Sequence, residues 1–180
     1  MVLDLFEKYN IDYSIKTIYI GLRTNFICRR ELENFAIDLI GLDEYKDNTF
    51  INDLIFEIDN MNMDIIFCGI EQTFNLKEFK YSDDEFKEFL KIQYIMILNE
   101  LQNLENNKID SIINLFDNLI HAFYLLYNLS RKDYNMPKIA EENMLELEDI
   151  LYDIYPTIEN TKSDFQKLYN YMDKLKMKIV

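Results

Sequence analysis

The chain contains a single histidine, His121, which lies in an apolar run between Ile120 and Ala122. Catalysis by a triad needs a base next to an identifiable nucleophile, and a helical zinc site of the H-E-x-x-H type needs a second histidine one turn away. Neither pattern surrounds His121. We therefore expect a packed, hydrogen-bonded histidine and no metal site.

Carboxylates are abundant, and some stand one helical turn apart, such as Glu142 with Glu146 and Glu146 with Asp149. Pairs of this kind could hold a metal ion or act as acid and base. Such sites need ligands that converge from several helices and usually include histidine. A solvated helix face explains the spacing more simply. The sequence also has no glycine-rich phosphate loop, nucleophile elbow or cysteine pair, so it predicts no enzyme, no catalytic residues and no cofactor.

The two cysteines, Cys28 and Cys68, are too few for a disulfide framework. Both sit among apolar residues, so we expect buried free thiols in a reducing compartment. The opening "MVLDLFEKYN" does not read as a signal peptide. The most apolar stretch, "IINLFDNLIHAFYLLYNL", is interrupted by polar residues and falls short of a membrane span. We therefore expect a cytoplasmic protein without a membrane partner.

Negative charge is the clearest compositional feature, with a formal net charge of -14 over 180 residues. Direct binding to nucleic acid is not expected, because an acidic surface repels phosphate. Two segments concentrate the charge. Residues 38–76 contain nine carboxylates against the single basic residue Lys46, and residues 139–161 contain seven with no Lys or Arg. Solubility alone explains an acidic surface, and a face for a basic protein partner is the alternative. The candidate face comprises Glu141, Glu142, Glu146, Glu148, Asp149 and Asp153.

The elements that would carry these residues are predicted to be helices. Three Gly and two Pro are too few for the turns of a β-sandwich or barrel. Residues 32–40 follow the helical spacing, and Gly41 would end that helix in the left-handed conformation. Asn48 or Thr49 would cap a helix that turns Ile51, Leu54, Ile55 and Ile58 inward. The segments around Ile18 and Ile66 fit a helix or a short strand equally well.

The second half of the chain has stronger helix signals. Ser82 and Glu85 form a capping box that opens a helix to about Leu104. A second long helix is predicted from about Ile109 to Leu129, with Phe116 and Phe123 inward, and should pack antiparallel to the first. A further helix follows Pro137. The last helix would present Phe165, Leu168, Tyr169, Met172, Leu175 and Ile179 to the core. The fold class is thus all-α: one domain over residues 1–180, a bundle of about seven or eight helices, with one short hairpin as a possible addition.

Two segments resemble an uncharacterised bacterial family, the domain of unknown function numbered 2247. The first is "KTIYIGLRTNFICRRELENFAIDLI", where residues 18–21 match an aromatic-aliphatic "IYIG", and residues 27–32 and 36–40 match its following helix. Cys28 stands where that pattern has Ser as the helix cap. The second is "LEDILYDIYPTIENTKSDFQKLYNYM", which is similar to the family's ending at Tyr155-Pro156 and Tyr171-Met172.

The resemblance implies a function without chemistry. Members of such families resemble immunity proteins of polymorphic and contact-dependent toxin systems, which are small, acidic and cytoplasmic. On that basis we expect a protein that neutralises a cognate, basic toxin domain. The alternative, from a different class, is a helical regulatory or scaffold protein that binds an endogenous cellular partner. The resemblance implies no catalytic residues.

Overall fold

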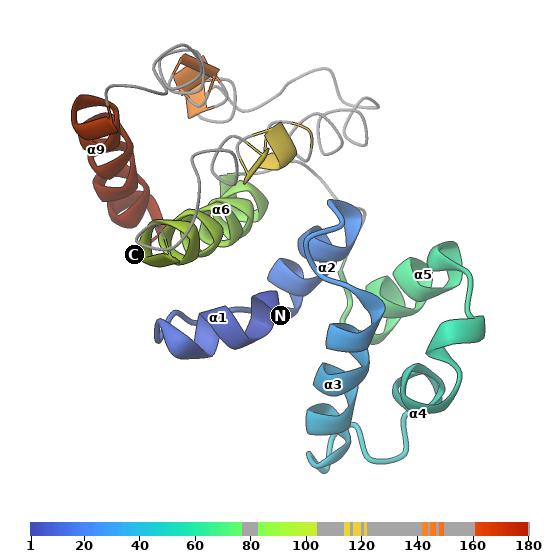
Figure 1. Ribbon diagram of the computed structural model, residues 1–180. Helices are drawn as coiled ribbons and strands as arrows, with labels where there is room; N and C mark the ends of the chain where they lie inside the picture. Colours follow the sequence, from blue (N-terminus) through green and yellow to red (C-terminus); the bar gives the residue numbers. More distant parts are fainter. Residues whose placement is uncertain are drawn as a thin grey trace.

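The computed structural model describes residues 1–76, 83–103, 114–115, 117–119, 121, 142–143, 145–146, 148–149 and 161–179. Within these residues every regular element is a helix and no strand occurs (Figure 1). The all-α class predicted from the sequence is therefore confirmed. Both segments that left a strand open are helical. The elements in chain order are α1 Val2–Lys8, α2 Ile15–Arg23, α3 Arg29–Ile40, α4 Thr49–Phe56, η1 Ile58–Asn60, α5 Met63–Thr73, α6 Asp83–Asn103 and α9 Thr161–Ile179.

Helix α2 forms despite its β-branched residues because its start is capped and its body is buried. The Ser14 backbone N–H donates to the Thr17 hydroxyl at 3.0 Å, and the Thr17 N–H donates to the Ser14 hydroxyl at 3.4 Å. This reciprocal pair satisfies donors that a helix start leaves free. Every residue from Thr17 to Leu22 is buried. Tertiary packing thus overrides the weak local preference.

Helices α3 and α4 follow the predicted spacing closely. In α3, Leu32, Ala36 and Leu39 are buried. Helix α4 begins after Asn48, whose side-chain oxygen accepts the Ile51 N–H at 3.1 Å. Asn48 is therefore the cap, and Thr49 is the first helical residue. The buried residues of this region are Ile51, Leu54 and Ile58, with Ile55 partly buried.

The prediction for Gly41 is wrong. Gly41 ends α3 with φ −69° and ψ −13°, a right-handed conformation. The chain continues turning with the same hand, since the Leu42 N–H donates to the Leu39 carbonyl at 2.9 Å. Left-handed residues do end three other helices, and all of them are asparagines: Asn10 after α1, Asn25 after α2 and Asn75 after α5. Asparagine tolerates positive φ better than most residues, so it takes the role expected of glycine.

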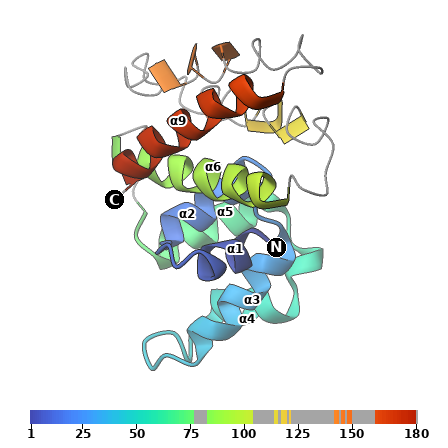
Figure 2. The ribbon, with the colours of Figure 1, turned by 60° about the vertical axis from the view of Figure 1, so that its left-hand side comes forward.

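Helix α6 is the centre of the molecule (Figure 2). It packs against α1 and α2 on one side and α9 on the other. Its buried residues accordingly occur around much of its circumference: Phe86, Phe89, Leu90, Ile92, Gln93, Tyr94, Ile95, Ile97 and Leu101. Helical spacing in the sequence predicts five interior residues in this range, and all are buried: Phe86, Phe89, Leu90, Ile97 and Leu101. Ser82 and Leu104 lie outside the described residues.

Helix α1 is joined to α6 across a long stretch of sequence. The Tyr9 hydroxyl, just after α1, donates to Gln102 Oε1 at 2.9 Å, and Lys8 Nζ lies 3.5 Å from Asn99 Oδ1. Three residues of α1 are buried: Val2, Leu3 and Phe6. The first helix of the chain is therefore part of the core.

The later helices are described in part. Residues 114, 115, 117–119 and 121 are helical, and Leu115 and Leu119 are buried, but Phe116 and Phe123 lie outside the described residues. In α9, Tyr171, Met172 and Leu175 are buried, whereas Tyr169 is 50% exposed. The inward assignment of Tyr169 is wrong, because the buried stripe is centred toward Tyr171 and leaves Tyr169 at its edge.

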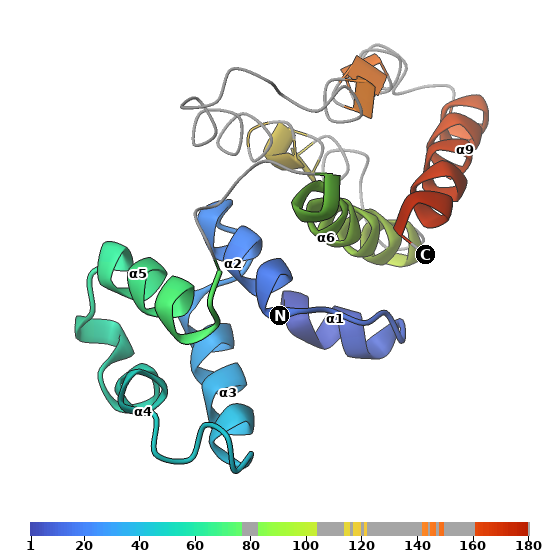
Figure 3. The same ribbon diagram turned by 180° about the vertical axis from the view of Figure 1, so that it is seen from behind.

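The molecule has two distant ends. Helices α4 and α5 lie at one end and α9 at the other, in the front view and from behind (Figures 1 and 3). In chain order, α3 follows α2 and leads to α4, and η1 joins α4 to α5. Where they are described, the two acidic segments consequently lie at different ends, because α4 and α5 belong to residues 38–76 and Glu146 contacts Lys174 of α9.

Candidate functional site

The acidic segment 139–161 forms helix where it is described, at residues 142–143, 145–146 and 148–149. Glu142 and Asp149 are exposed, and Glu146 and Glu148 are partly buried. Glu141 and Asp153 lie outside the described residues. The structure therefore places two of the six candidate carboxylates fully at the surface and two at its margin.

A basic residue from another helix reaches this segment. Lys174 of α9 forms an ion pair with the Glu146 carboxylate. The segment contains no Lys or Arg in sequence, but Lys174 compensates part of its charge in space. Glu146 is thereby tied to α9. Among the described carboxylates of the segment, Glu142 and Asp149 are the exposed ones.

A buried polar cluster lies beneath the same segment. Asn143 is fully buried, and its Nδ2 donates to Gln93 Oε1 of α6 at 3.1 Å. The Tyr171 hydroxyl of α9 donates to Asn143 Oδ1 at 3.0 Å, and burial raises the pKa of this phenol well above its usual range. Gln93 Nε2 has no partner among the described residues. A buried polar group without a partner costs free energy, and a shift of one helix along another would break these hydrogen bonds. The network therefore favours one register of α6, α9 and the segment around Asn143.

The cluster of Gln93, Asn143 and Tyr171 was not identified from the sequence. The available signal was Asn143, a polar residue that occupies an interior position in a run of apolar and acidic residues. Its partners stand 50 and 28 residues away, and no spacing rule connects them. The cluster positions the acidic segment on α6 and α9.

The second acidic segment displays its charge more openly. Eight of its nine carboxylates are exposed: Asp38, Asp43, Glu44, Asp47, Asp53, Glu57, Asp59 and Asp64. Large apolar side chains are exposed in the same region. Phe56, the last residue of α4, is 77% exposed, and Ile65 of α5 is 57% exposed. The exposure of Phe56 and Ile65 was not predicted from the sequence. A helical projection would have indicated it, because it shows an apolar residue on the polar side of a helix.

The ninth carboxylate, Glu71, joins a polar cluster between α2 and α5. The Tyr19 hydroxyl donates to Glu71 Oε1, and Arg23 Nη2 donates to the Tyr19 oxygen at 2.8 Å. Burial, followed by the hydrogen bond to Glu71, raises the pKa of Tyr19 to about 12, although Arg23 opposes the rise. The Arg23 guanidinium also lies 3.7 Å from the centre of the Phe67 ring. These contacts hold α5 against α2.

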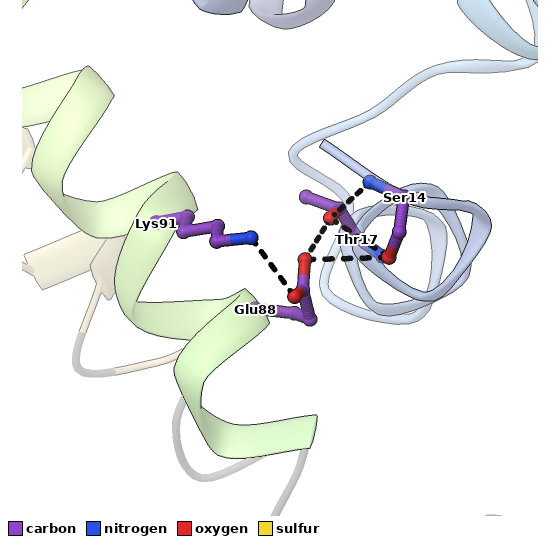
Figure 4. Close-up of polar contacts among 4 residues, drawn as sticks. All are labelled: Ser14, Thr17, Glu88 and Lys91. Carbon is purple, nitrogen blue, oxygen red and sulfur yellow. Dashed lines mark hydrogen bonds and ion pairs between the residues drawn. The ribbon is translucent and has the colours of Figure 1, made fainter. Parts of the chain in front are cut away.

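Figure 4 shows a further cluster, between α2 and α6, that brings hydroxyls, a carboxylate and an amine together. Glu88 Oε2 accepts from the hydroxyls of Thr17 and Ser14, and Glu88 Oε1 binds Lys91 Nζ at 3.0 Å. The lysine thus meets the carboxylate oxygen opposite to the one that binds the hydroxyls. A carboxylate at the start of α2 also interacts favourably with the positive end of that helix. The arrangement joins the capped start of α2 to α6.

The predictions for His121 and for the cysteines are wrong about burial. His121 is exposed, because Leu115 and Leu119 define the inward stripe and His121 falls two residues beyond it, on the opposite side of the helix. Cys28 and Cys68 are exposed free thiols. Cys28 occupies the N-cap of α3, and Cys68 lies on the outer face of α5, where Gln72 Nε2 approaches its sulfur at 3.2 Å.

Within the described part of the chain, no group of three or more His, Cys, Asp or Glu residues could hold a metal ion. None of the helices described is long and apolar enough to cross a membrane. Comparison of the chain with models of protein families, with curated proteins and with solved structures gave no match. The resemblance noted from the sequence stays a prediction.

Proposed function

We propose that this protein is an immunity-type inhibitor that binds a cognate, basic toxin domain and blocks its active site or the path of its substrate. The observation that carries the proposal is the display of carboxylates on exposed helical surfaces by a chain of net charge -14. Complementary charge accelerates encounter with a basic partner and disfavours wrong partners. The hydrogen-bonded clusters in the structure cap helices or join them, which fits a binding protein.

The first candidate contact is the 139–161 segment. Glu142 and Asp149 are exposed on it, while Asn143 anchors it to α6 and α9 through the buried cluster. An anchored helix presents its charges in a fixed arrangement, so binding would order few additional groups. The candidate face retains Glu141, Glu142, Glu146, Glu148, Asp149 and Asp153.

The test is charge reversal of Glu141, Glu142 and Glu148 in one variant. Association with a toxin domain encoded directly upstream of the gene should slow, most strongly at low salt, because exposed charges act chiefly on encounter. Cells that express the toxin should lose protection, while the helical circular dichroism spectrum stays unchanged. Reversal of Glu7 and Asp12, exposed carboxylates near α1, is the control. Unchanged association and full protection would exclude this face, and failure to bind any such toxin would favour the regulatory or scaffold alternative.

A further inference from the structure

The outer faces of α4 and α5 combine exposed apolar side chains with carboxylates. On α4 the exposed residues Thr49, Asp53 and Phe56 recur at helical spacing. On α5 the exposed stripe is Ile65, Cys68 and Gln72. Phe56 and Ile65 stand on either side of η1, in the connection between the two helices. A single exposed apolar side chain needs no partner, but exposed apolar side chains with a polar rim are typical of sites that bind other proteins.

Four carboxylates flank Phe56 and Ile65 in the sequence. Asp53 stands one turn before Phe56, Glu57 follows it, Asp59 lies in η1, and Asp64 precedes Ile65; all four are exposed. We call the six residues Asp53, Phe56, Glu57, Asp59, Asp64 and Ile65 the α4–α5 surface. One basic side chain, Arg29, contacts this region, and its Nη1 donates to the backbone carbonyls of Ile58 and Asp59 at 2.9 and 3.3 Å. That guanidinium closes the C-terminal end of η1 from the side of α3.

The α4–α5 surface rests on a packed interior. Ile51 and Leu54 of α4 and Ile66 and Ile70 of α5 are buried at 1% exposure or less. The two helices approach closely where Phe50 packs on Gly69, since a β-carbon at Gly69 would come within 2.0 Å of the Phe50 ring. Exposed side chains on such a support can be changed with little effect on the stability of the fold.

Charge decides which class of partner fits this surface. A second copy of the chain would bring two acidic rims together, and nucleic acid or an anionic membrane would meet the same repulsion. A protein face rich in Lys and Arg, with an apolar pocket for an aromatic ring, is complementary in both respects. Buried aromatic anchors within a charged rim are a common arrangement at protein interfaces.

We propose that the α4–α5 surface is the principal docking site for a basic protein domain, with Phe56 as its anchor and the four carboxylates as its steering rim. The proposal rests on the proposed function in taking the toxin domain as that partner. It places the principal contact at the end of the molecule remote from α9, in place of the 139–161 segment. If it is correct, the charge reversal of Glu141, Glu142 and Glu148 leaves association unchanged. Phe56 enters the partner's pocket, Ile65 extends the apolar contact, and the carboxylates meet its lysines and arginines.

The chain offers a matched control at the opposite end. Met177 of α9 is also 77% exposed, and its neighbours Lys174, Lys176 and Lys178 are basic. The photoreactive residue p-benzoylphenylalanine is introduced at Phe56, Met177 or Asp149 of the full chain, which is expressed in its native host and irradiated. Each cross-linked protein is identified by mass spectrometry, produced in pure form, and tested for binding to the wild-type chain, to Phe56→Ala, to Met177→Ala and to the neutralised variant Asp53→Asn/Glu57→Gln/Asp59→Asn/Asp64→Asn.

The expected result is a cross-link from Phe56, and none from Met177, to a protein with more Lys and Arg than Asp and Glu. Phe56→Ala should weaken its binding by about tenfold or more, and the neutralised variant should slow association by about tenfold at low salt and less at high salt. Met177→Ala should bind as the wild type does. Circular dichroism on each variant shows that the helices are intact.

The other outcomes separate this proposal from the proposed function. A basic partner that cross-links from Phe56 but does not arrest growth when expressed alone supports the docking site and contradicts the immunity function. A toxic partner that cross-links from Asp149 alone supports immunity and overturns the α4–α5 surface. A cross-link from Phe56 to a second copy of the chain, an acidic partner, or no cross-link from Phe56 would each overturn the docking site.

Discussion

The buried carboxylate of Glu31 accepts the backbone N–H of Leu3 at 2.9 Å, across 28 residues of sequence. Its second oxygen accepts the N–H of Cys28 at 3.1 Å, at the start of its own helix. One side chain thus satisfies free donors at the N-termini of both α1 and α3, where negative charge is also favoured by the helix dipole. Glu31 is 3% exposed, so water cannot replace either bond easily.

Replacing Glu31 by Gln should destabilise the protein by about 1–3 kcal/mol, because an amide offers one acceptor oxygen where the carboxylate offers two and turns an N–H toward a buried donor. Urea denaturation measures the change. Glu33→Gln, on the same helix but only partly buried, is the control and should remain within about 0.5 kcal/mol of the wild type. Equal stability of the Glu31 and Glu33 variants would show that the double cap contributes nothing.

Removing the Tyr171 hydroxyl should disturb the buried polar cluster. Tyr171→Phe keeps the ring but leaves Asn143 Oδ1 without its donor, and we expect a loss of about 1–3 kcal/mol. The control is Tyr169→Phe, two residues earlier, since Tyr169 is 50% exposed and its change should stay below about 0.5 kcal/mol. Chemical denaturation of both variants provides the comparison. A Tyr171 variant as stable as the Tyr169 variant would contradict an energetic role for the cluster.

The raised pKa of Tyr19 predicts a loss of stability at alkaline pH. The pKa rises from 10.0 in the unfolded chain to about 12 in the fold. The fold therefore favours the neutral phenol, and this contribution is complete below about pH 10 and is lost as the pH rises through 12. By pH 12 the loss in unfolding free energy should amount to about 1–2 kcal/mol.

The measurement is the unfolding free energy of the wild type and of Tyr19→Phe at several pH values. The wild type should lose more stability than the Phe variant between pH 10 and 12, since the unfolded variant has no phenol to ionise at this position. The chain contains 13 tyrosines, so the difference between the two proteins isolates Tyr19. Parallel curves over this range would contradict the assignment.

Two glycine substitutions should have opposite outcomes. A β-carbon at Gly21 would lie 2.4 Å from Ile27, which is 2% exposed and has little room to move, so Gly21→Ala should cost about 1–3 kcal/mol. Gly41 has right-handed angles and meets only the Asp38 carbonyl at 3.3 Å. Gly41→Ala should therefore be neutral or stabilising by up to about 1 kcal/mol. Thermal denaturation of both variants checks the contrast, and a clear loss at Gly41 would indicate left-handed backbone there.

Local patterns in the sequence predicted the helices well, because helical spacing reports directly which side of a segment is apolar. The interior of α3, the Asn48 cap of α4 and the buried residues of α6 follow from such patterns. Tendencies of residue types were less reliable. Histidine and cysteine are often buried, yet His121 and Cys68 lie on the outer sides of their helices. Position on the helix decides exposure, and the type of residue does not.

Contacts between distant segments could not be predicted. Glu31 with Leu3, Glu88 with Thr17, and Asn143 with Gln93 join residues that are 28, 71 and 50 positions apart. Periodicity shows that a helix has an apolar face but not which other helix covers it. For the same reason the acidic character of both candidate surfaces can be read from the sequence, while the exposure of Phe56 and the pairing of Glu146 with Lys174 cannot.

The contacts between α1 and the end of α6 have a consequence for synthesis of the chain. Tyr9 cannot meet Gln102, nor Lys8 meet Asn99, until the 93 and 91 residues that separate these partners have also left the ribosome. At roughly 5–20 residues per second, translation of that length takes on the order of 5–20 seconds. During this interval Val2, Leu3 and Phe6, which are buried in the finished fold, emerge before α6 is present to cover them. Helix α1 therefore completes its part of the core only after α6 has been made.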